Sequence, residues 1–286
     1  MSTLLVTGRN GFVGQALVQK LKQKHHILPV VRRLQSGVEY AGEDPILCDV
    51  RFLKAEHLSG RRPDWIIHLA AQIRNGPHSI LRNNLQGVRA ICDLARVLSV
   101  PIIFLSTANV LFEGALGAYA KSKRMGEELL KSAGVPHIII RTPLILGKNS
   151  GSLRSVKRFH DRFSFLLLLG AQEGKVQPIP VHAVVDWIEA KLTAAPKASE
   201  AIHLVGQRVY SYREILEYVM KGESAARFLR VPYGAALTLV GLLERLRIPL
   251  SVSTEMIRSM NMDKVIEDGK VDNVVWVDNA RETLFG

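Results

Sequence analysis

Short apolar runs and amphipathic stretches alternate along the first half of the chain. The apolar runs are rich in β-branched residues, which is typical of buried strands. They occupy residues 3–8, 26–33, 64–71, 101–107 and 137–143. Apolar residues recur at helical spacing over residues 11–24, 83–98 and 119–134. Strands that are apolar throughout and alternate with helices predict an α/β fold, a doubly wound parallel sheet with helices on both faces.

The pattern is less regular in the second half of the chain. A basic, partly aromatic stretch at 152–163 is followed by the apolar run 163–171. The simpler interpretation is a solvated helix face followed by a core helix, and the alternatives are a surface for a substrate diphosphate or for anionic lipid. Residues 178–192 predict a turn, a short strand and a helix, and 211–221 predict a helix capped by Ser211. The apolar runs are too short to span a bilayer.

Composition narrows the function classes. The chain has 286 residues, 47% hydrophobic and 22% charged, which is ordinary for a globular protein. Its net charge of +12 suits anionic partners, but the basic residues are dispersed and we expect no nucleic-acid partner. Cys48 and Cys92 form no CxxC pair and the first residues do not resemble a signal peptide, so we expect a cytoplasmic protein. The histidines show no metal-ligand spacing, so we expect no metal.

A glycine-rich turn joins the first predicted strand to the first predicted helix. Gly8, Gly11 and Gly14 stand at three-residue intervals in the sequence VTGRNGFVG. Glycine permits a tight turn and a close backbone approach, and the helix N-terminus presents free N–H groups to a pyrophosphate. The alternative is a packing turn that binds no ligand. We expect a dinucleotide site made by Gly8, Arg9, Asn10, Gly11, Phe12, Val13 and Gly14.

The end of the second strand indicates which dinucleotide binds. A carboxylate there would bond the 2′-hydroxyl of the adenosine ribose, but the chain has Arg32 and Arg33 and no carboxylate before Glu39. Two guanidinium groups suit a 2′-phosphate, so we expect NADP rather than NAD; the alternative is a solvated arginine pair. Asp49, after the presumed third strand, either accepts a hydrogen bond from the adenine amino group or caps a turn, and both interpretations stay open.

Two hydroxyls and a Tyr/Lys pair follow the later strands. The strand at 101–107 ends in Ser106 and Thr107, and the carboxyl ends of strands line the crevice of a doubly wound sheet. Tyr119 and Lys123 stand at i and i+4, hence on one helical face. An ammonium lowers the pKa of a nearby phenol, which can then exchange a proton with a carbonyl or alcohol oxygen that a hydroxyl orients. These groups suit carbonyl/alcohol redox chemistry with a nicotinamide, although this spacing also occurs by chance on helices.

Together the motifs resemble those of the short-chain dehydrogenase/reductase superfamily, and most closely its extended, epimerase/dehydratase-type branch. The resemblance covers residues 3–206. The matching elements are Thr7-Gly8-x-x-Gly11-x-x-Gly14, Asp49-Val50, His68 to Ala71, Asn84 with Gly87, Ser106 and Thr107, Tyr119 with Lys123, and the strand end at 141–147. These motifs are specific to the superfamily and say little about the substrate.

The resemblance implies roles for these residues. Tyr119 would be the acid/base, Lys123 would hold the nicotinamide ribose and tune Tyr119, and Thr107 would orient the substrate oxygen. Further cofactor contacts are implied for Val50, Leu69, Ala70, Ala71, Asn84 and Ser106. The usual substrates of this branch are nucleotide-linked sugars, and its reactions include 4-epimerisation, dehydration and 4-keto reduction. Arg154 and Arg158 are candidates for binding a substrate diphosphate.

The resemblance also implies how the chain is divided. Residues 1–150 would form an NADP-binding Rossmann domain to which 179–206 return. Residues 151–178 and 207–286 would form a smaller substrate-binding lobe, and we expect a homodimer.

Some features depart from the usual pattern of this branch. Only eleven residues separate Thr107 from Tyr119, where most extended members carry a longer loop that contributes to the substrate site. Leu146 replaces the usual tyrosine before Gly147.

The C-terminal part favours a second hypothesis. Residues 231–251 resemble members related to the NADPH-binding accessory subunit of respiratory complex I. The chain would then be a non-catalytic NADPH-binding module with a structural or regulatory role, in contact with a protein or, peripherally, with a membrane. The leucines of this part are expected to form core or a partner surface, namely Leu237, Leu239, Leu242 and Leu243.

Overall fold

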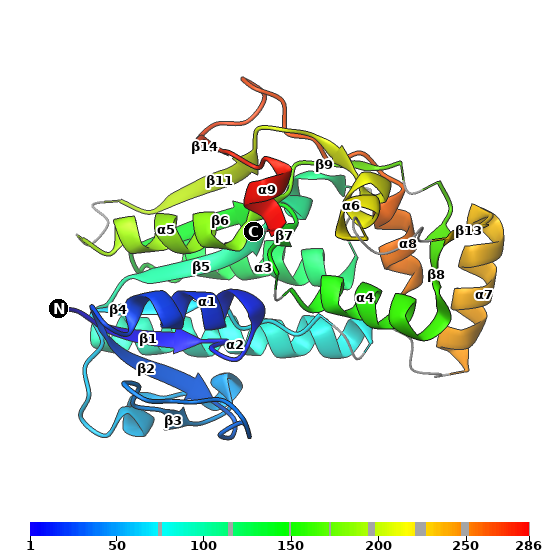
Figure 1. Ribbon diagram of the computed structural model, residues 1–286. Helices are drawn as coiled ribbons and strands as arrows, with labels where there is room; N and C mark the ends of the chain where they lie inside the picture. The colour runs from blue at the N-terminus through cyan, green and yellow to red at the C-terminus, as the bar shows by residue number, and fades with distance from the viewer. Residues whose placement is uncertain are drawn as a thin grey trace.

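The computed structural model has an eight-stranded sheet at its centre, with helices on both faces and a smaller group of elements beyond the carboxyl ends of the strands (Figure 1). It describes residues 1–73, 76–113, 117–148, 150–171, 173–193, 198–220, 227–246 and 252–285. Every neighbouring pair of strands in this sheet runs parallel. The predicted doubly wound α/β fold is therefore confirmed.

The strands of the main sheet lie in the order β14-β11-β6-β5-β4-β1-β2-β3. Their bounds are β1 Thr3–Thr7, β2 His26–Val31, β3 Ile46–Leu47, β4 Trp65–His68, β5 Ile102–Thr107, β6 His137–Thr142, β11 Glu200–Gly206 and β14 Val274–Val277. The apolar runs correctly predict β1, β2, β4, β5 and β6. The chain moves outward from β1 through β2 and β3 and then crosses to β4, so the strand order reverses between β1 and β4. Ligands of such sheets bind beyond the carboxyl ends of the strands at this point.

Four helices form the layers on either side of the sheet. Their bounds are α1 Phe12–Leu21, α2 Pro77–Leu98, α3 Ala118–Ser132 and α5 Val181–Lys191. The core on one face contains side chains of α1 and α5, and the core on the other face contains those of α2 and α3. Successive residues of a strand point to opposite faces, so in β1 Leu4 packs in the first core and Leu5 in the second. Apolar residues are therefore needed at every position of the strand.

A smaller lobe lies beyond the carboxyl ends of the strands (Figure 1). Its main elements are α4 Gly151–Phe163, β8 Phe165–Leu169, α6 Tyr212–Val219, β13 Arg227–Val231, α7 Tyr233–Arg245 and α8 Thr254–Met260. Short strands link it to the sheet, namely β7 Ile145–Leu146, β9 Lys175–Val176, β10 Ile179–Pro180 and β12 Tyr210–Ser211. As predicted, Ser211 caps α6, because its Oγ accepts a hydrogen bond from the Glu214 N–H at 3.1 Å. Within the described residues, no helix is both long and apolar enough to cross a bilayer.

Two segments differ from the sequence-based expectations. The apolar run at 163–171, expected as a helix in its simpler interpretation, contains the strand β8, which pairs in parallel with β13. Leu167 is 37% exposed while its neighbours Leu166 and Leu168 are buried, a period of two that an unbroken apolar run conceals. The main sheet also contains β14, although residues 207–286 were assigned to the smaller lobe. Apart from β14, the division of the chain into a domain and a lobe stays a prediction.

Candidate active site

The turn between β1 and α1 requires glycine at positions 8 and 14. Gly8 has φ +77°, and a Cβ at this position would lie 2.6 Å from the backbone nitrogen of Ala70. A Cβ at Gly14 would lie 2.2 Å from the carbonyl oxygen of Gly8. The Gly11 N–H donates to that same oxygen at 2.9 Å, which closes the turn. The turn is therefore tight, and it is pressed against the chain that leaves β4.

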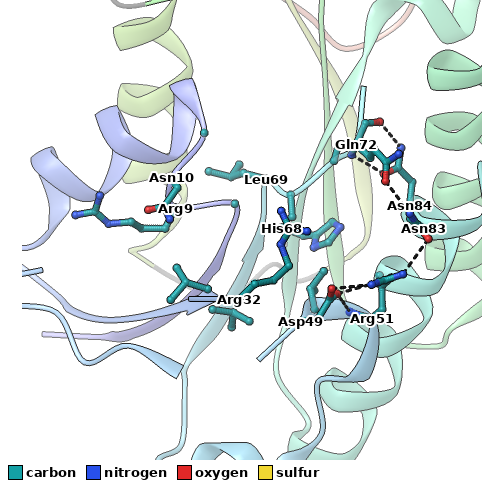
Figure 2. A pocket seen from close by; sticks show the side chains of 18 of the residues that line it. Arg9, Asn10, Arg32, Asp49, Arg51, His68, Leu69, Gln72, Asn83 and Asn84 are labelled. Carbon is teal, nitrogen blue, oxygen red and sulfur yellow. Dashed lines mark hydrogen bonds and ion pairs between the residues drawn. The ribbon is translucent and has the colours of Figure 1, made fainter. Parts of the chain in front are cut away.

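Two cavities meet at this turn, with volumes of about 400 Å³ and 380 Å³. They share the lining residues Gly8, Gly11, Leu69 and Ala71. The first cavity, which Figure 2 shows from close by, extends to Arg32 and Asp49. The second extends to Thr107 and Tyr119. The turn therefore lies between the predicted adenosine end and the predicted reacting end of the site.

This arrangement fits a dinucleotide. The helix α1 begins at its N-cap Gly11, which has no side chain to occupy the N–H groups of the first turn. Those donors and the positive end of the helix dipole suit a pyrophosphate. The missing Cβ atoms of Gly8 and Gly14 allow the close backbone approach that a bound diphosphate requires.

Most of the predicted site residues line one of these cavities. In the first cavity they are Gly8, Arg9, Asn10, Gly11, Arg32, Asp49, Val50, Leu69, Ala70, Ala71 and Asn84. The second adds Phe12, Val13, Gly14, Ser106, Thr107 and Tyr119. Arg33, Arg154 and Arg158 are exposed and line neither cavity, and Lys123 is buried behind the lining.

At the adenosine end, Asp49 is held by a residue that the sequence analysis did not identify. Arg51 donates from Nε to Asp49 Oδ1 at 3.0 Å and from its terminal nitrogen to Oδ2 at 2.9 Å. The hydrogen bonds and charge of Arg51 keep the pKa of Asp49 below its usual range. Asp49 also accepts the Arg51 N–H at 3.0 Å as the cap of a short 3-10 helix, Val50–Phe52. The capping interpretation is thus confirmed, and the adenine contact stays a prediction.

The guanidinium of Arg9 holds a loop. It donates from Nε to Glu43 at 2.8 Å and from a terminal nitrogen to the Glu39 carbonyl at 2.8 Å, and it lies over the ring of Tyr40. The side chain of Glu43 is fully buried, so its carboxylate requires this partner. Figure 2 shows the Arg9 side chain directed away from the cavity. The phosphate contact of Arg9 therefore stays a prediction, and only for its backbone N–H group.

The end of β4 is fixed by a hydroxyl of β1. The Thr7 hydroxyl accepts the Ala70 N–H at 3.3 Å and lies 2.8 Å from His68 Nδ1. Burial, helped by the positive charge of Lys123, lowers the pKa of His68 to about 3. His68 is therefore neutral and can accept the hydrogen of the Thr7 hydroxyl. This pair sets the path of the chain at the point where both cavities meet.

Asn84 connects the start of α3 to the chain that follows β4. Its side-chain oxygen accepts the Gln72 N–H at 2.7 Å, and its side-chain nitrogen donates to the Gln72 carbonyl at 3.0 Å. The same nitrogen donates to Ser122 Oγ at 2.8 Å, and that hydroxyl donates to the Tyr119 carbonyl at 2.7 Å. The backbone of Tyr119 is thus positioned through Ser122 and Asn84.

The two hydroxyls at the end of β5 point to opposite sides of the sheet. Ser106 donates to Glu127 at 2.5 Å, and Glu127 also binds the guanidinium of Arg141 at 2.6 Å. Thr107 Oγ1 accepts the Asn109 N–H at 3.3 Å in the second cavity. The hydroxyl of Ser106 therefore belongs to a buried ion-pair cluster, and that of Thr107 belongs to the candidate active site.

Tyr119 and Lys123 lie together but do not shift each other's pKa as expected. Lys123 Nζ lies 5.9 Å from the Tyr119 ring centre and donates to the Leu105 carbonyl at 2.6 Å. Burial lowers the pKa of Lys123 to about 7, although the charge of Glu127 opposes this shift. Burial raises the pKa of Tyr119 to about 12. The expected lowering of the tyrosine pKa is wrong for the protein alone, because burial disfavours the charged phenolate.

The wall contributed by the smaller lobe holds residues that the sequence analysis missed. Tyr212 and Lys264 line the second cavity together with Tyr119. The Lys264 ammonium donates to the Tyr212 hydroxyl at 2.9 Å. No spacing or motif in the sequence connects the two, because 52 positions separate them.

Comparisons with known proteins show the family to which the chain belongs. The sequence model of the NAD dependent epimerase/dehydratase family matches residues 4–191 of the chain. The chain belongs to this family. A dTDP-4-dehydrorhamnose reductase of Sinorhizobium fredii is 25% identical, over 76% of each chain. A ceramide reductase of Caulobacter vibrioides is 26% identical, over 82% of this chain and 74% of its own.

The fold is also that of a solved UDP-glucuronic acid 4-epimerase from Bacillus cereus in complex with NAD. The two structures superpose with a TM-score of 0.69 at 18% identity, over 90% of this chain and 94% of the other. The resemblance inferred from the motifs is thus confirmed, as are the Rossmann-type fold and the expectation of an NAD(P)-dependent epimerase, dehydratase or reductase. The cofactor is a nicotinamide dinucleotide.

Proposed function

We propose that the chain is an NADP-dependent oxidoreductase or epimerase that acts by hydride transfer on a carbonyl or alcohol carbon of a nucleotide sugar. One observation carries the proposal: Thr107 and Tyr119 line the same cavity as Gly8 and Gly11 of the glycine turn. A dinucleotide held at the turn can therefore reach the cavity that contains the phenol and the hydroxyl. The substrate class is supported by the relative whose name contains a dTDP-linked sugar.

In this proposal Tyr119 is the acid/base and Thr107 orients the reacting oxygen. Because its pKa is raised to about 12, the Tyr119 phenol keeps its proton at neutral pH and can donate it to a carbonyl oxygen. The oxygen of Thr107 accepts the Asn109 N–H, so the Thr107 O–H can donate to the same substrate oxygen. When bound, the nicotinamide supplies or accepts the hydride. In the reverse direction, Tyr119 takes the proton of an alcohol.

The preference for NADP is assigned to Arg32. Its side chain lines the first cavity, and its positive charge contributes to the lowered pKa of Asp49, so the two groups are close. A guanidinium at this place suits a 2′-phosphate in charge and in geometry. Arg33 is exposed and does not line the cavity, so we assign it a smaller part.

Contacts outside the cavities are also proposals. Arg154 and Arg158 are exposed on α4, where a substrate diphosphate could be bound at the surface of the lobe.

A homodimer or a peripheral membrane contact would use the apolar surface of α7. There Leu239 and Leu242 are 56% and 53% exposed, in agreement with the expected partner surface rather than with core. Light scattering and vesicle flotation would test these two contacts.

The function is tested by following both the nicotinamide absorbance and the conversion of the sugar. The purified chain is mixed with NADP(H) and a panel of nucleotide sugars and 4-keto sugars, and the products are analysed as well, because epimerisation regenerates the cofactor and leaves the absorbance unchanged. We expect turnover with at least one nucleotide sugar, and a loss of about 10²–10⁴-fold in the Tyr119→Phe variant. Tyr233→Phe is the matched control, because Tyr233 lies exposed on α7.

Two outcomes would contradict the proposal. No change in the cofactor and no conversion of any sugar of the panel, together with an unchanged Tyr119→Phe variant, would favour the non-catalytic module instead. Ceramide is tested in the same way, and its turnover in the absence of turnover of any nucleotide sugar would keep the redox chemistry and overturn the substrate class.

A further inference from the structure

Lys264 is a buried cation in the wall that faces the proposed acid/base. It follows α8, and its backbone N–H donates to the Lys175 carbonyl at 2.7 Å. Only 5% of the residue is exposed, and it lines the cavity that also contains Thr107 and Tyr119. Its Nζ donates to the Tyr212 hydroxyl at 2.9 Å and to Ser259 Oγ at 2.6 Å. The ammonium is thus held in one place by hydroxyls from two different helices.

This cation has no counter-ion within the described part of the chain. There, no carboxylate oxygen approaches Lys264 Nζ closely enough to form an ion pair. Two other cations of the described residues are paired, Arg9 with Glu43 and Arg141 with Glu127. Within the same residues, buried Lys123 forms no ion pair, but it has the negative charge of Glu127 nearby. Burying a charge without a partner is costly, and hydroxyls orient an ammonium without neutralising it. We therefore expect a ligand in the cavity to supply the negative charge that pairs with Lys264.

We propose that Lys264, with the Tyr212 hydroxyl beside it and Ser259 orienting its ammonium, binds a carboxylate carried by the reacting sugar of the substrate, so that the enzyme acts on a nucleotide-linked sugar acid. This inference rests on the proposed function. Lys264 shares its cavity with Tyr119 and Thr107, so the group that it binds lies on the same part of the substrate as the reacting carbon.

The number of charges favours a carboxylate over the diphosphate of the substrate. Of the three groups, the Lys264 ammonium and the Tyr212 hydroxyl line the cavity, and together they match the single negative charge of one carboxylate. A diphosphate carries more charge and is usually bound by several cations, often by arginines. Burial also lowers the pKa of Lys264 to about 8, so the group is still largely protonated at neutral pH and available to an anion.

The inference predicts discrimination between two sugars that differ at one group. UDP-glucuronic acid carries a carboxylate where UDP-glucose carries a hydroxymethyl group. A neutral sugar leaves the buried ammonium unpaired, and sites built for a polar group reject ligands that lack it. We therefore expect the acid to bind at least about tenfold more tightly than the neutral sugar.

The test is calorimetry of both ligands with the chain saturated with NADP⁺. All proteins carry Tyr119→Phe, so that binding is measured without turnover. We expect Lys264→Met to remove the preference for the acid and to leave the affinity for UDP-glucose within about twofold. Lys270→Met is the control and should keep the full preference, because the side chain of Lys270 is 69% exposed and paired with Glu267.

Each other outcome overturns the inference in a recognisable way. Equal affinities for the two sugars before Lys264 is changed would overturn it while leaving the proposed function intact, and this comparison does not depend on whether the Lys264 variant folds. An equal loss of both affinities in Lys264→Met would place the diphosphate at this lysine instead. Failure of both ligands to bind would overturn the inference together with the nucleotide-sugar proposal. Lys264→Gln is the second variant, with the same expectation.

Discussion

The ammonium of Lys123 lies 5.9 Å from the ring centre of Tyr119, one turn further along α3. Both groups are desolvated, so both favour their neutral forms: the pKa of Lys123 falls to about 7 and that of Tyr119 rises to about 12. A phenol that keeps its proton is ready to donate it to a carbonyl. The ammonium, in contrast, changes its charge within the physiological pH range.

The first prediction concerns this change of charge. If the charged form of Lys123 supports turnover, kcat/KM for the reduction should fall as pH rises through about 7, since the free enzyme then loses the ammonium. The fall should approach about tenfold per pH unit. Lys123→Arg keeps a positive charge at all these pH values and should give a flat profile, even at a lower absolute rate. Initial rates measured between about pH 6 and about pH 9 check this. A flat profile in the unmodified enzyme would contradict it.

A second prediction separates the two hydroxyls at the end of β5. Thr107→Ala should lower kcat/KM by about tenfold or more, because a hydroxyl facing the reacting oxygen is lost, with a small effect on unfolding. Ser106→Ala should instead lower the stability of the fold and leave kcat/KM nearly unchanged. It removes the 2.5 Å hydrogen bond to Glu127 and should cost about 1–3 kcal/mol of stability, with nearly unchanged turnover. Rates and urea denaturation of the same two variants check both parts. Loss of kcat/KM in Ser106→Ala and loss of stability in Thr107→Ala would contradict the roles assigned to the two hydroxyls.

The third prediction concerns cofactor choice. Arg32→Ala should weaken NADPH binding by about tenfold or more and NADH binding by much less, because only NADPH carries the 2′-phosphate. Arg33→Ala is the matched control and should change either affinity little, since Arg33 does not line the cavity. Fluorescence titrations with both cofactors measure these affinities. Equal losses for NADPH and NADH in Arg32→Ala would contradict the 2′-phosphate assignment.

The sequence predicts those parts of the molecule that depend on local pattern. A strand buried on both faces must be apolar at every position, which is why β1, β2, β4, β5 and β6 are evident. The glycine turn is equally predictable, because Gly8 and Gly14 leave no room for a Cβ. The Tyr119/Lys123 pair follows from its helical spacing. In each case the physical cause lies within a few consecutive residues.

The remaining features depend on contacts between distant segments. Arg51 is bonded to Asp49 two positions earlier, but its place at the predicted adenosine end is also fixed by Asn83, 32 positions later, which accepts its hydrogen bond at 3.0 Å. Lys264 enters the cavity because α6 brings Tyr212 and α8 brings Ser259 beside it. The direction of the Tyr119 pKa shift likewise depends on burial, which the residue types do not reveal. The surroundings of Lys264 are set by the packing of the smaller lobe, where the sequence pattern is weakest.

The fourth prediction concerns the buried cluster below the site. Glu127→Gln leaves the Arg141 guanidinium buried without its counter-ion and should cost about 3–5 kcal/mol of stability. Glu128→Gln is the matched control, because Glu128 is the exposed neighbour on α3. Chemical denaturation of both variants measures the difference, and equal stabilities would contradict it. The negative charge of Glu127 also raises the pKa of Lys123, so Glu127→Gln should move the fall in kcat/KM to lower pH.

The last prediction tests the charge of Lys264 without any ligand. Burial lowers the pKa of Lys264 from 10.5 to about 8, so between these values the unfolded chain holds more protons than the folded chain. Folding stability therefore rises with pH across this window, and the penalty for burying the charge is complete below pH 8 and absent above 10.5.

Removing the lysine should remove this dependence. The stability of the native chain minus that of Lys264→Met should increase by about 3 kcal/mol between pH 7 and pH 10.5, at about 1.4 kcal/mol per unit of pKa shift. The hydrogen bonds lost by Tyr212 and Ser259 add a nearly constant offset and do not affect this slope. Lys270→Met should show almost no such change, because Lys270 is exposed. Urea denaturation over this pH range measures both differences in stability. A difference between the native chain and Lys264→Met that stays constant with pH would show that a counter-ion already pairs with the ammonium in the folded chain.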